Sequence, residues 1–305
     1  MMTRKGWLLF IAISLIWGVP YFFIKIAVRE LDPVVIVCTR AAIGAVVLLP
    51  LAASQKMLRP LLSRWPILLA FSLIHMAGSF MLITYGEQFI PSSLASLLIA
   101  ANPLLVALIA LGFVKSERIN GPRLVGLLIG MLGLVVLLGF EVGSNGRQMI
   151  GVAFLLLAAL GYAVGALLLK HSPLAELPRI GIAAAECSIT TVVLLPLTVT
   201  HFPTSVPSVK VIMSLLVLGL LCTALALPIF FALIQEVGAS RGTVITYINP
   251  AVSVLLGVLV LREPLTLGIV AGFLLIIAGS WFSTTGTIPP LFVRQAAKPE
   301  VPSRV

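Results

Sequence analysis

Long apolar runs separated by short polar segments follow one another along almost the whole chain. Each run is close to the length of about 20 residues that a helix needs to cross roughly 30 Å of hydrocarbon. We therefore predict ten membrane-spanning helices. They lie at 6–28, 34–53, 66–86, 92–114 and 122–140, and at 149–169, 180–200, 209–234, 240–261 and 265–286.

The pattern of the first half returns in the second half. The hexapeptide Val-Val-Leu-Leu-Pro-Leu occupies 46–51 and again 192–197, and other residues repeat at nearly the same offset. The repeated residues pair Lys25 with Lys170, Asn102-Pro103 with Asn249-Pro250, Glu117 with Glu263, Gly126 with Gly272 and Gly133 with Gly279. We therefore predict two homologous halves, 1–140 and 149–286, a linker at 141–148, and a disordered cytoplasmic tail at 287–305.

Each predicted half contains five spans, which is an odd number. The second half must therefore enter the membrane from the opposite side, so that the halves are related by inverted topology. This arrangement is common in secondary transporters, whose two halves exchange inward-open and outward-open states around a central site. The predicted fold class is an all-α integral membrane protein built from two inverted-topology repeats.

The composition agrees with a lipid environment. Apolar residues make up 60% of the chain and charged residues 10%, the mean hydropathy is +1.18, and a soluble domain carries about 25% charged residues. The net charge of +10 would suggest nucleic acid in a soluble protein. Here the basic residues lie in short loops, so we expect a lipid bilayer and no nucleic acid. Cys38, Cys187 and Cys222 lie in apolar runs without metal-ligand spacing and are interpreted as buried packing residues.

The distribution of lysine and arginine predicts the orientation. With a cytoplasmic N-terminus, 14 of the 20 basic residues fall in cytoplasmic segments and 4 in external loops, while Lys25 and Arg40 lie inside spans. This bias satisfies the positive-inside rule. Both termini are therefore predicted to be cytoplasmic, with the first span acting as an uncleaved anchor.

Several motifs together resemble a known family. They are Trp17-Gly18 with Lys25-Ile-Ala, Arg40, the segment from Asn102-Pro103 to Glu117-Arg118, and the segment from Asn249-Pro250 to Arg262-Glu263-Pro264-Leu. The chain resembles the drug/metabolite transporter superfamily, specifically its ten-helix EamA-type members. The resemblance implies export of amino acids and other small metabolites across the bacterial inner membrane, although some members carry drugs or vitamins. It also leads us to expect a neutral residue such as Gln where this chain has Glu186.

Two oppositely charged residues inside spans are candidates for substrate binding or coupling. Glu186 lies about eight residues into the seventh span, roughly 12 Å along the helix, where an ionised carboxylate is costly. We favour a protonatable or substrate-contacting role over a neutral or structurally paired carboxyl group. Arg40 either neutralises a substrate carboxylate, or extends to the interface, or pairs with Asp32 or Glu30. Arg40 and Glu186 occupy equivalent positions in the two predicted halves, but this does not by itself predict an ion pair between them.

Two further ionisable residues are weighed in the same way. Lys25 lies near the outer end of the first span, five residues after a helix-kinking Pro20. Extension to the interface and a functional role explain Lys25 equally well. His75 in the third span could relay protons because its ordinary pKa is near neutral, but we favour a hydrogen-bonded packing role.

The remaining candidates are neutral. Asn102 and Asn249 precede mid-span prolines, and we interpret them chiefly as kink and packing residues that also shape the central cavity. Aromatic residues either line that cavity or face lipid. The aromatic candidates are Trp17, Tyr21, Tyr85 and Tyr247.

Glycines recur at the ends of both halves, as Gly126-x-x-x-Gly130 and Gly268-x-x-x-Gly272. Such spacing permits close helix approach, either between the halves of one chain or between two copies. We favour the intramolecular seam, and the sequence leaves a monomer and a homodimer both open.

A secondary transporter working by alternating access is the leading hypothesis, with a small-molecule substrate and no cofactor. The sequence contains no phosphate-binding nucleotide loop. Proton coupling through Glu186 and simple facilitated diffusion fit equally well. A lipid-modifying membrane enzyme would need clustered catalytic groups, but His75, His171 and His201 are scattered, so we predict no enzymatic activity and no metal site. A channel or an uptake carrier for another solute is the other alternative.

Overall fold

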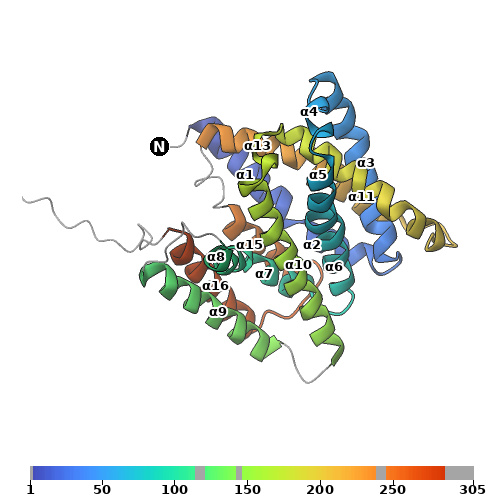
Figure 1. The fold of residues 1–305 in the computed structure, drawn as a ribbon. Coiled ribbons are helices and arrows are strands. Elements are labelled where there is room, and N and C mark those ends of the chain that lie inside the picture. Colours follow the sequence, from blue (N-terminus) through green and yellow to red (C-terminus); the bar gives the residue numbers. More distant parts are fainter. Residues whose placement is uncertain (1–2, 114–120, 142–145, 238–244, 286–305) are drawn as a thin grey trace, which may run out of the picture.

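A computed structural model of the chain describes residues 3–113, 121–141, 146–237 and 245–285. Every regular element in these ranges is a helix, and Figure 1 shows the helices packed side by side in one bundle. Up to residue 141 the elements are α1 (Arg4–Gly18), α2 (Pro20–Ala27), α3 (Pro33–Ser54), α4 (Arg59–Leu62), α5 (Trp65–Ser72), η1 (Leu73–Gly78), α6 (Ser79–Gly86), α7 (Ser92–Ala100), α8 (Asn102–Phe113) and α9 (Gly121–Glu141).

The remaining elements follow residue 145. They are α10 (Gly146–His171), η2 (Pro173–Glu176), α11 (Arg179–Thr200), α12 (Val209–Leu216), η3 (Val217–Leu225), α13 (Ala226–Val237), α15 (Ile245–Leu259) and α16 (Leu267–Thr285). Glu141 and 146–148, which we predicted as linker, belong to α9 and α10. The start of the predicted ninth span and the predicted tail lie outside the described residues.

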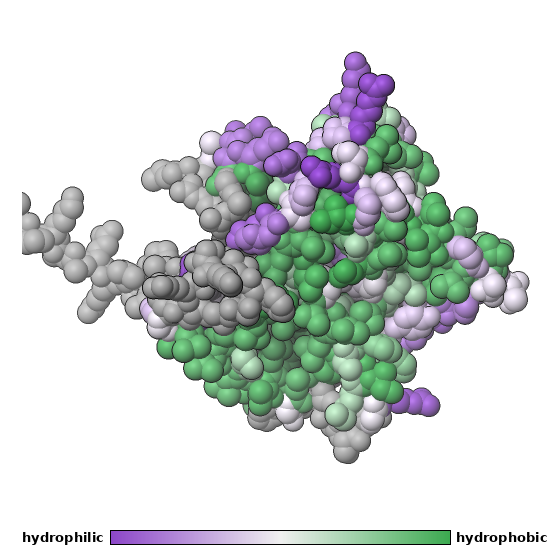
Figure 2. All heavy atoms as spheres, in the orientation of Figure 1, coloured by the Kyte–Doolittle hydropathy of each residue, from purple (hydrophilic) through white to green (hydrophobic). Residues whose placement is uncertain are grey.

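The prediction of an all-α membrane protein is confirmed. The described residues contain 8 helical segments that are long and apolar enough to cross a membrane, together with two shorter apolar helices, Ile248–Leu259 and Leu267–Ser283. Large apolar side chains are openly exposed on the outside, for example Val46 at 74% and Leu267 at 84%. Figure 2 shows hydrophobic residues over most of the visible face, with hydrophilic residues gathered around α4 and the start of α1. Such a surface is stable in lipid and not in water.

Several spans are interrupted, and the interruptions have local causes. Pro20 cannot donate a backbone hydrogen bond, so the first span breaks into α1 and α2 at Val19. The third and eighth spans instead contain the wider π-helical segments η1 and η3. In each, a hydroxyl group donates to the carbonyl five residues earlier, from Ser79 to Ile74 at 3.0 Å and from Thr223 to Leu218 at 2.9 Å. Backbone acceptors are thus satisfied where the helix widens.

Helices α9 and α16 pack together along their lengths through glycines. A Cβ atom at Gly133 would lie 2.8 Å from the backbone nitrogen of Ile276, and one at Gly279 would overlap the backbone of Gly130. Likewise, a Cβ atom at Gly272 would lie 2.7 Å from that of Leu137. The predicted intramolecular glycine seam is therefore confirmed between these two helices.

Several other helix contacts form matching pairs. Helix α3 packs against α11, α1 packs against α13 and α15, and α10 packs against α6 and α8. The first span thus contacts the eighth and ninth, as the sixth contacts the third and fourth. If the first five spans exchange numbers with the last five, this set of helix contacts stays the same.

Candidate functional site

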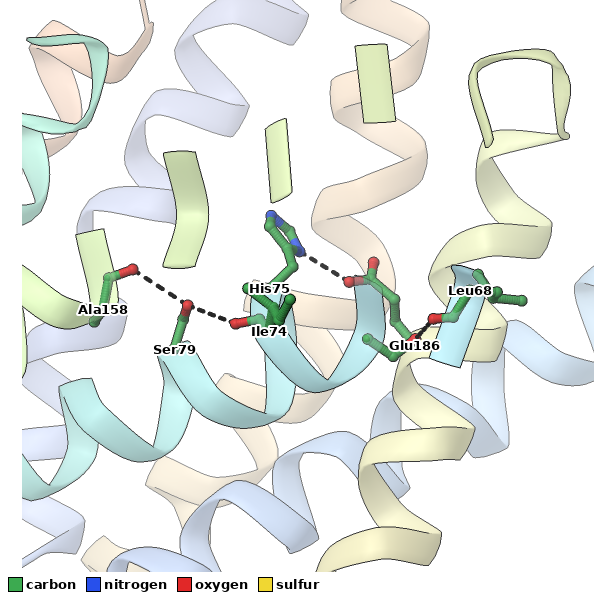
Figure 3. Close-up of polar contacts among 7 residues, drawn as sticks. Leu68, Ile74, His75, Ser79, Ala158 and Glu186 are labelled. Carbon is green, nitrogen blue, oxygen red and sulfur yellow. Dashed lines mark hydrogen bonds and ion pairs between the residues drawn. The ribbon is translucent and has the colours of Figure 1, made fainter. Parts of the chain in front are cut away.

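His75 and Glu186 are joined by a side-chain hydrogen bond between neighbouring helices. The Nδ1 atom of His75, in η1, lies 2.8 Å from a carboxylate oxygen of Glu186, in α11. Figure 3 shows the two side chains pointing toward one another from neighbouring helices. In the same view Ser79 donates to the carbonyl oxygens of Ile74 and Ala158, the second at 3.2 Å. The π-helical segment is therefore bonded both to itself and to α10.

The imidazole of His75 is held by rings on both sides. It stacks on Phe71 with the centroids 4.9 Å apart and the planes at 11°, and it meets the edge of Tyr162 at 5.3 Å. On α10, Gly165 leaves the space that the imidazole occupies, since a Cβ atom there would lie 2.5 Å from its Cδ2 atom. The ring of His75 is therefore packed among side chains, and Glu186 is its polar partner.

Arg40 lies in the same region and is only 8% exposed. Its Nε atom donates to the hydroxyl group of Thr223 in η3 at 2.9 Å, and its guanidinium lies 4.1 Å from the centroid of Phe80. Phe80 in turn meets Tyr162 at 6.3 Å. Neither Asp32, which caps α3, nor Glu30, which binds Ser208, is the partner of Arg40. We call Arg40, His75, Phe80, Tyr162, Glu186 and Thr223 the central cluster.

The bonds of Arg40 and Glu186 are reciprocal. The two residues lie 146 positions apart, the offset of the repeated hexapeptide, on helices α3 and α11, which pack together. Arg40 binds the π-helical segment η3 of the eighth span, and Glu186 binds the π-helical segment η1 of the third span. Each residue therefore joins its own half of the sequence to the other half.

A second polar group lies where the first and third spans end. The Nζ atom of Lys25 donates to the carbonyl oxygens of Glu87 at 2.5 Å and Ile90 at 2.7 Å. Lys25 therefore binds backbone instead of extending to the interface. The Glu87 side chain is fully buried, and neither carboxyl oxygen has a hydrogen-bond partner among the described residues. Sequence reasoning missed Glu87 because it follows the predicted third span and resembles a loop residue.

Glu263, which is distant in sequence from Lys25 and Glu87, also belongs to this second group. Its carboxylate accepts from the backbone nitrogen of Ser92 at 2.8 Å, the Ser92 hydroxyl at 2.9 Å and the backbone nitrogen of Ser93 at 3.0 Å. It therefore caps α7, where a negative charge is stabilised by free N–H groups. In the sequence it was noticed as a repeat marker and as part of the motif that ends Arg262-Glu263-Pro264-Leu, but not as a site residue. We call Lys25, Glu87, Ile90, Ser92, Ser93 and Glu263 the Lys25 cluster.

Glu30 makes a similar contact outside the spans. It accepts from the backbone nitrogen of Ser208 at 2.7 Å and from its hydroxyl at 2.6 Å, just before α12 begins. These two hydrogen bonds favour the ionised carboxylate and lower the pKa of Glu30 below its ordinary value.

The aromatic candidates are distributed over several places. Trp17 packs on Phe230 with centroids 4.8 Å apart, and Tyr85 packs on Phe154 at 6.4 Å. Tyr21 lies between the two clusters, within electrostatic range of both Glu87 and Arg40. Tyr21 thus lies near charged groups of both clusters.

The two asparagine candidates have different hydrogen-bonding surroundings. Asn102 begins α8, and its carboxamide oxygen is buried without a hydrogen-bond partner in the described part of the chain. Asn249, with its amide nitrogen turned toward acceptors, donates to the carbonyl oxygens of Ile245 at 2.9 Å and Ser14 at 3.1 Å. Asn249 thus links α15 to α1, while the side chain of Tyr247 lies outside the described residues.

No group of three or more His, Cys, Asp or Glu side chains in the described ranges could hold a metal ion. The two clusters instead offer paired charges, aromatic faces and backbone carbonyls. Groups of these kinds can bind a small charged solute or a proton.

Comparison with known proteins gives consistent matches over nearly the whole length. A model of the EamA-like transporter family matches residues 4–139 and 149–285. The chain is 28% identical over 278 residues to the uncharacterized transporter YoaV of Bacillus subtilis (strain 168), covering 90% of this chain and 94% of that one. It is 27% identical to a probable amino-acid metabolite efflux pump of Salmonella typhimurium, over 93% of this chain and 96% of the other. One solved crystal structure shares the fold, with a TM-score of 0.66 at 20% identity, and the match covers 92% of this chain and 97% of that one.

Proposed function

The chain belongs to the EamA-like transporter family, and we propose that it is a secondary transporter that exports amino acids or related small metabolites by alternating access. The export of amino-acid metabolites is named for a relative at 27% identity. For this chain the proposal depends on the central cluster, and it describes a carrier without enzymatic chemistry.

The pairing of opposite charges within the central cluster carries the proposal. Arg40 and Glu186 both lie within electrostatic range of Tyr162, and both are 8% exposed. Within the described residues Arg40 has one hydrogen bond, through Nε, which leaves its two Nη groups for a carboxylate. Glu186 would receive the ammonium group in exchange for His75. An amino acid carries both charges a short distance apart, so it is complementary to this pair.

Phe80 and Tyr162 add an apolar wall between the two charged groups. The guanidinium already lies over the Phe80 ring, and Tyr162 contacts both Phe80 and His75. Aromatic faces beside a few oriented polar groups are typical of small-molecule sites. This composition favours amphipathic solutes over fully polar ones such as sugars.

The helix contacts support two inverted repeats, 1–140 and 149–286, exchanging between two states. The contacts of the first span with the eighth and ninth match those of the sixth with the third and fourth. The family model also matches in two segments, one on each side of residues 140–148. With the predicted charge bias, we place the protein in a bacterial inner membrane with both termini cytoplasmic.

A vesicle assay tests this proposal. The purified protein is reconstituted into vesicles that are preloaded with unlabelled L-amino acids. It should accelerate entry of the same amino acids in labelled form, and the rate of entry should saturate with their concentration. Arg40→Gln and Glu186→Gln should each weaken this exchange. A flux that rises linearly with concentration would indicate a channel, and no flux of any amino acid would contradict the proposed substrate class.

A further inference from the structure

The carboxyl group of Glu87 is not needed by the central cluster and has no local use in holding the fold. It is fully buried, and neither oxygen is hydrogen-bonded within the described part of the chain. An ionised carboxylate in such surroundings costs several kcal/mol, whereas a protonated carboxyl group costs much less. Glu87 is thus built to hold a proton unless a cation moves against it.

The position of Glu87 on its helix strengthens this argument. It is the C-cap of α6, where the free carbonyl groups concentrate negative partial charge. A negative side chain is disfavoured there, and a positive one is favoured. Lys25 accordingly donates to the carbonyl oxygens of Glu87 and Ile90, and not to the carboxyl group.

The neighbouring charges divide into two sets. Lys25 and Arg40 favour an ionised Glu87 and Glu263 disfavours it, while the phenol of Tyr21 also lies nearby. Glu263 already accepts three hydrogen bonds from Ser92 and Ser93, so its own negative charge is compensated. Glu87 has no such hydrogen bonds within the described residues.

We propose that Glu87 is the proton-binding site that couples transport to a proton gradient, with Lys25 as its counter-ion. When the O–H bond of Glu87 breaks, the proton passes to water at this end of the bundle. The ammonium group of Lys25 then leaves the two carbonyl oxygens and pairs with the new carboxylate. The inference rests on the proposed transport function and places coupling at Glu87 instead of Glu186.

The proposed exchange has a structural consequence. Lys25 ties the end of the third span to α2, and Glu263 ties the start of α7 to the segment after α15. Release of the two carbonyl oxygens would free the connection between α6 and α7, which lies between these two ties. Proton loss at Glu87 would thereby loosen one end of the bundle.

The protonation step can be tested without any substrate. Infrared difference spectra of the reconstituted wild type, recorded while the pH is raised, should show loss of a protonated carboxyl band. The band should be absent in Glu87→Gln and retained in Glu176→Gln, which changes an exposed glutamate in η2. Lys25→Met should keep the band to higher pH because the counter-ion is missing. A wild-type spectrum equal to that of Glu87→Gln would overturn the inference.

The coupling step is tested in vesicles with an imposed pH gradient and an equimolar mixture of radiolabelled L-amino acids. The gradient should stimulate transport by the wild type and by Glu176→Gln, and the stimulation should disappear in Glu87→Gln while exchange without a gradient continues. Stimulation that survives in Glu87→Gln would overturn the coupling role. Absence of transport by the wild type would instead contradict the proposed function, while the infrared result would still decide whether Glu87 holds the proton.

Discussion

Arg40 and Glu186 lie 146 residues apart, at the offset of the repeated hexapeptide, and do not bind each other. Each binds the π-helical segment in the other half of the sequence. Arg40 reaches Thr223 at 2.9 Å, and Glu186 reaches His75 at 2.8 Å. Two opposite charges are thus held apart by partners of their own. A solute that carries both charges can replace those partners without leaving either charge unpaired, which is the physical basis of the predictions below.

Glu186→Gln should lower the affinity for amino acids while leaving the fold intact. Gln can still bind His75, but it cannot supply the negative charge that an ammonium group needs. A hydrogen bond to a charged group contributes about 1.5–3 kcal/mol, which corresponds to an increase in Kd of about 10- to 100-fold. Binding measured by thermal shift against an amino-acid panel would show it.

The pH response separates Glu186 from Glu87. If coupling resides at Glu87, Glu186→Gln should retain stimulation of transport by a pH gradient at saturating amino acid. Loss of that stimulation in Glu186→Gln, with Glu87→Gln unaffected, would return the coupling role to the residue that the sequence suggested.

Gly165→Ala should disturb the histidine site. The added Cβ atom would lie 2.5 Å from the Cδ2 atom and 2.8 Å from the Cβ atom of His75, so the His75 side chain must shift. Overpacking of this kind costs about 1–3 kcal/mol. Thermal unfolding in detergent should show a lowered Tm and transport should weaken.

Gly139→Ala is the matched control for that variant. Gly139 is also a helical glycine, but a Cβ atom there meets nothing within 4 Å. Its Tm should equal or slightly exceed that of the wild type because alanine favours the helix. Equal effects of the two substitutions would show that the space beside His75 is not the cause.

Gly279→Val should break the seam between α9 and α16. Its side chain would overlap the backbone of Gly130, and backbone atoms cannot move aside as a flexible side chain can. We expect a fall in Tm larger than that of Gly165→Ala, measured with Gly139→Ala as the same control. An unchanged Tm would mean that the two helices do not pack this closely.

Glu30 should make stability depend on pH at the acid end. Because hydrogen bonds from Ser208 lower the pKa of Glu30 in the folded protein, the ionised group stabilises the fold above its ordinary pKa of 4.5. This contribution is lost as the pH falls through the lower, folded-state pKa.

The measurement for Glu30 is the Tm difference between the wild type and Glu30→Gln. The wild type should have the higher Tm at neutral pH, and the difference should close as the pH falls below 4.5. A difference that stays constant down to acid pH would show that the Ser208 contact does not stabilise the folded state.

Hydropathy alone predicted most of the fold, because a span must be apolar over a fixed length whatever its neighbours are. It placed Pro33–Ser54 and Arg179–Thr200 within a residue or so of their observed ends. The π-helical segments were not predicted, since no residue pattern distinguishes a wider turn in an apolar run. Their causes, such as the Ser79 contacts to Ile74 and Ala158, appear only once the helices are packed.

The site was predicted less completely. Arg40, His75 and Glu186 were recognised because each is an ionisable residue inside an apolar run, but the partners depend on which helices cross. Glu87 escaped notice because it follows its span by one residue, and its burial is produced by helices from distant parts of the chain. A carboxylate beside the end of an apolar run, with a lysine near the end of another, is the signal that could have found it.

The glycine seam has a mechanical consequence. Where Gly279 meets Gly130 and Gly133 meets Ile276, main chain rests on main chain, so there are no side chains that could change rotamer to let the helices slide. Helices α9 and α16 should therefore move together as one rigid unit. Any rocking between the two halves has to take place among the remaining helices, whose contacts consist of side chains that can exchange.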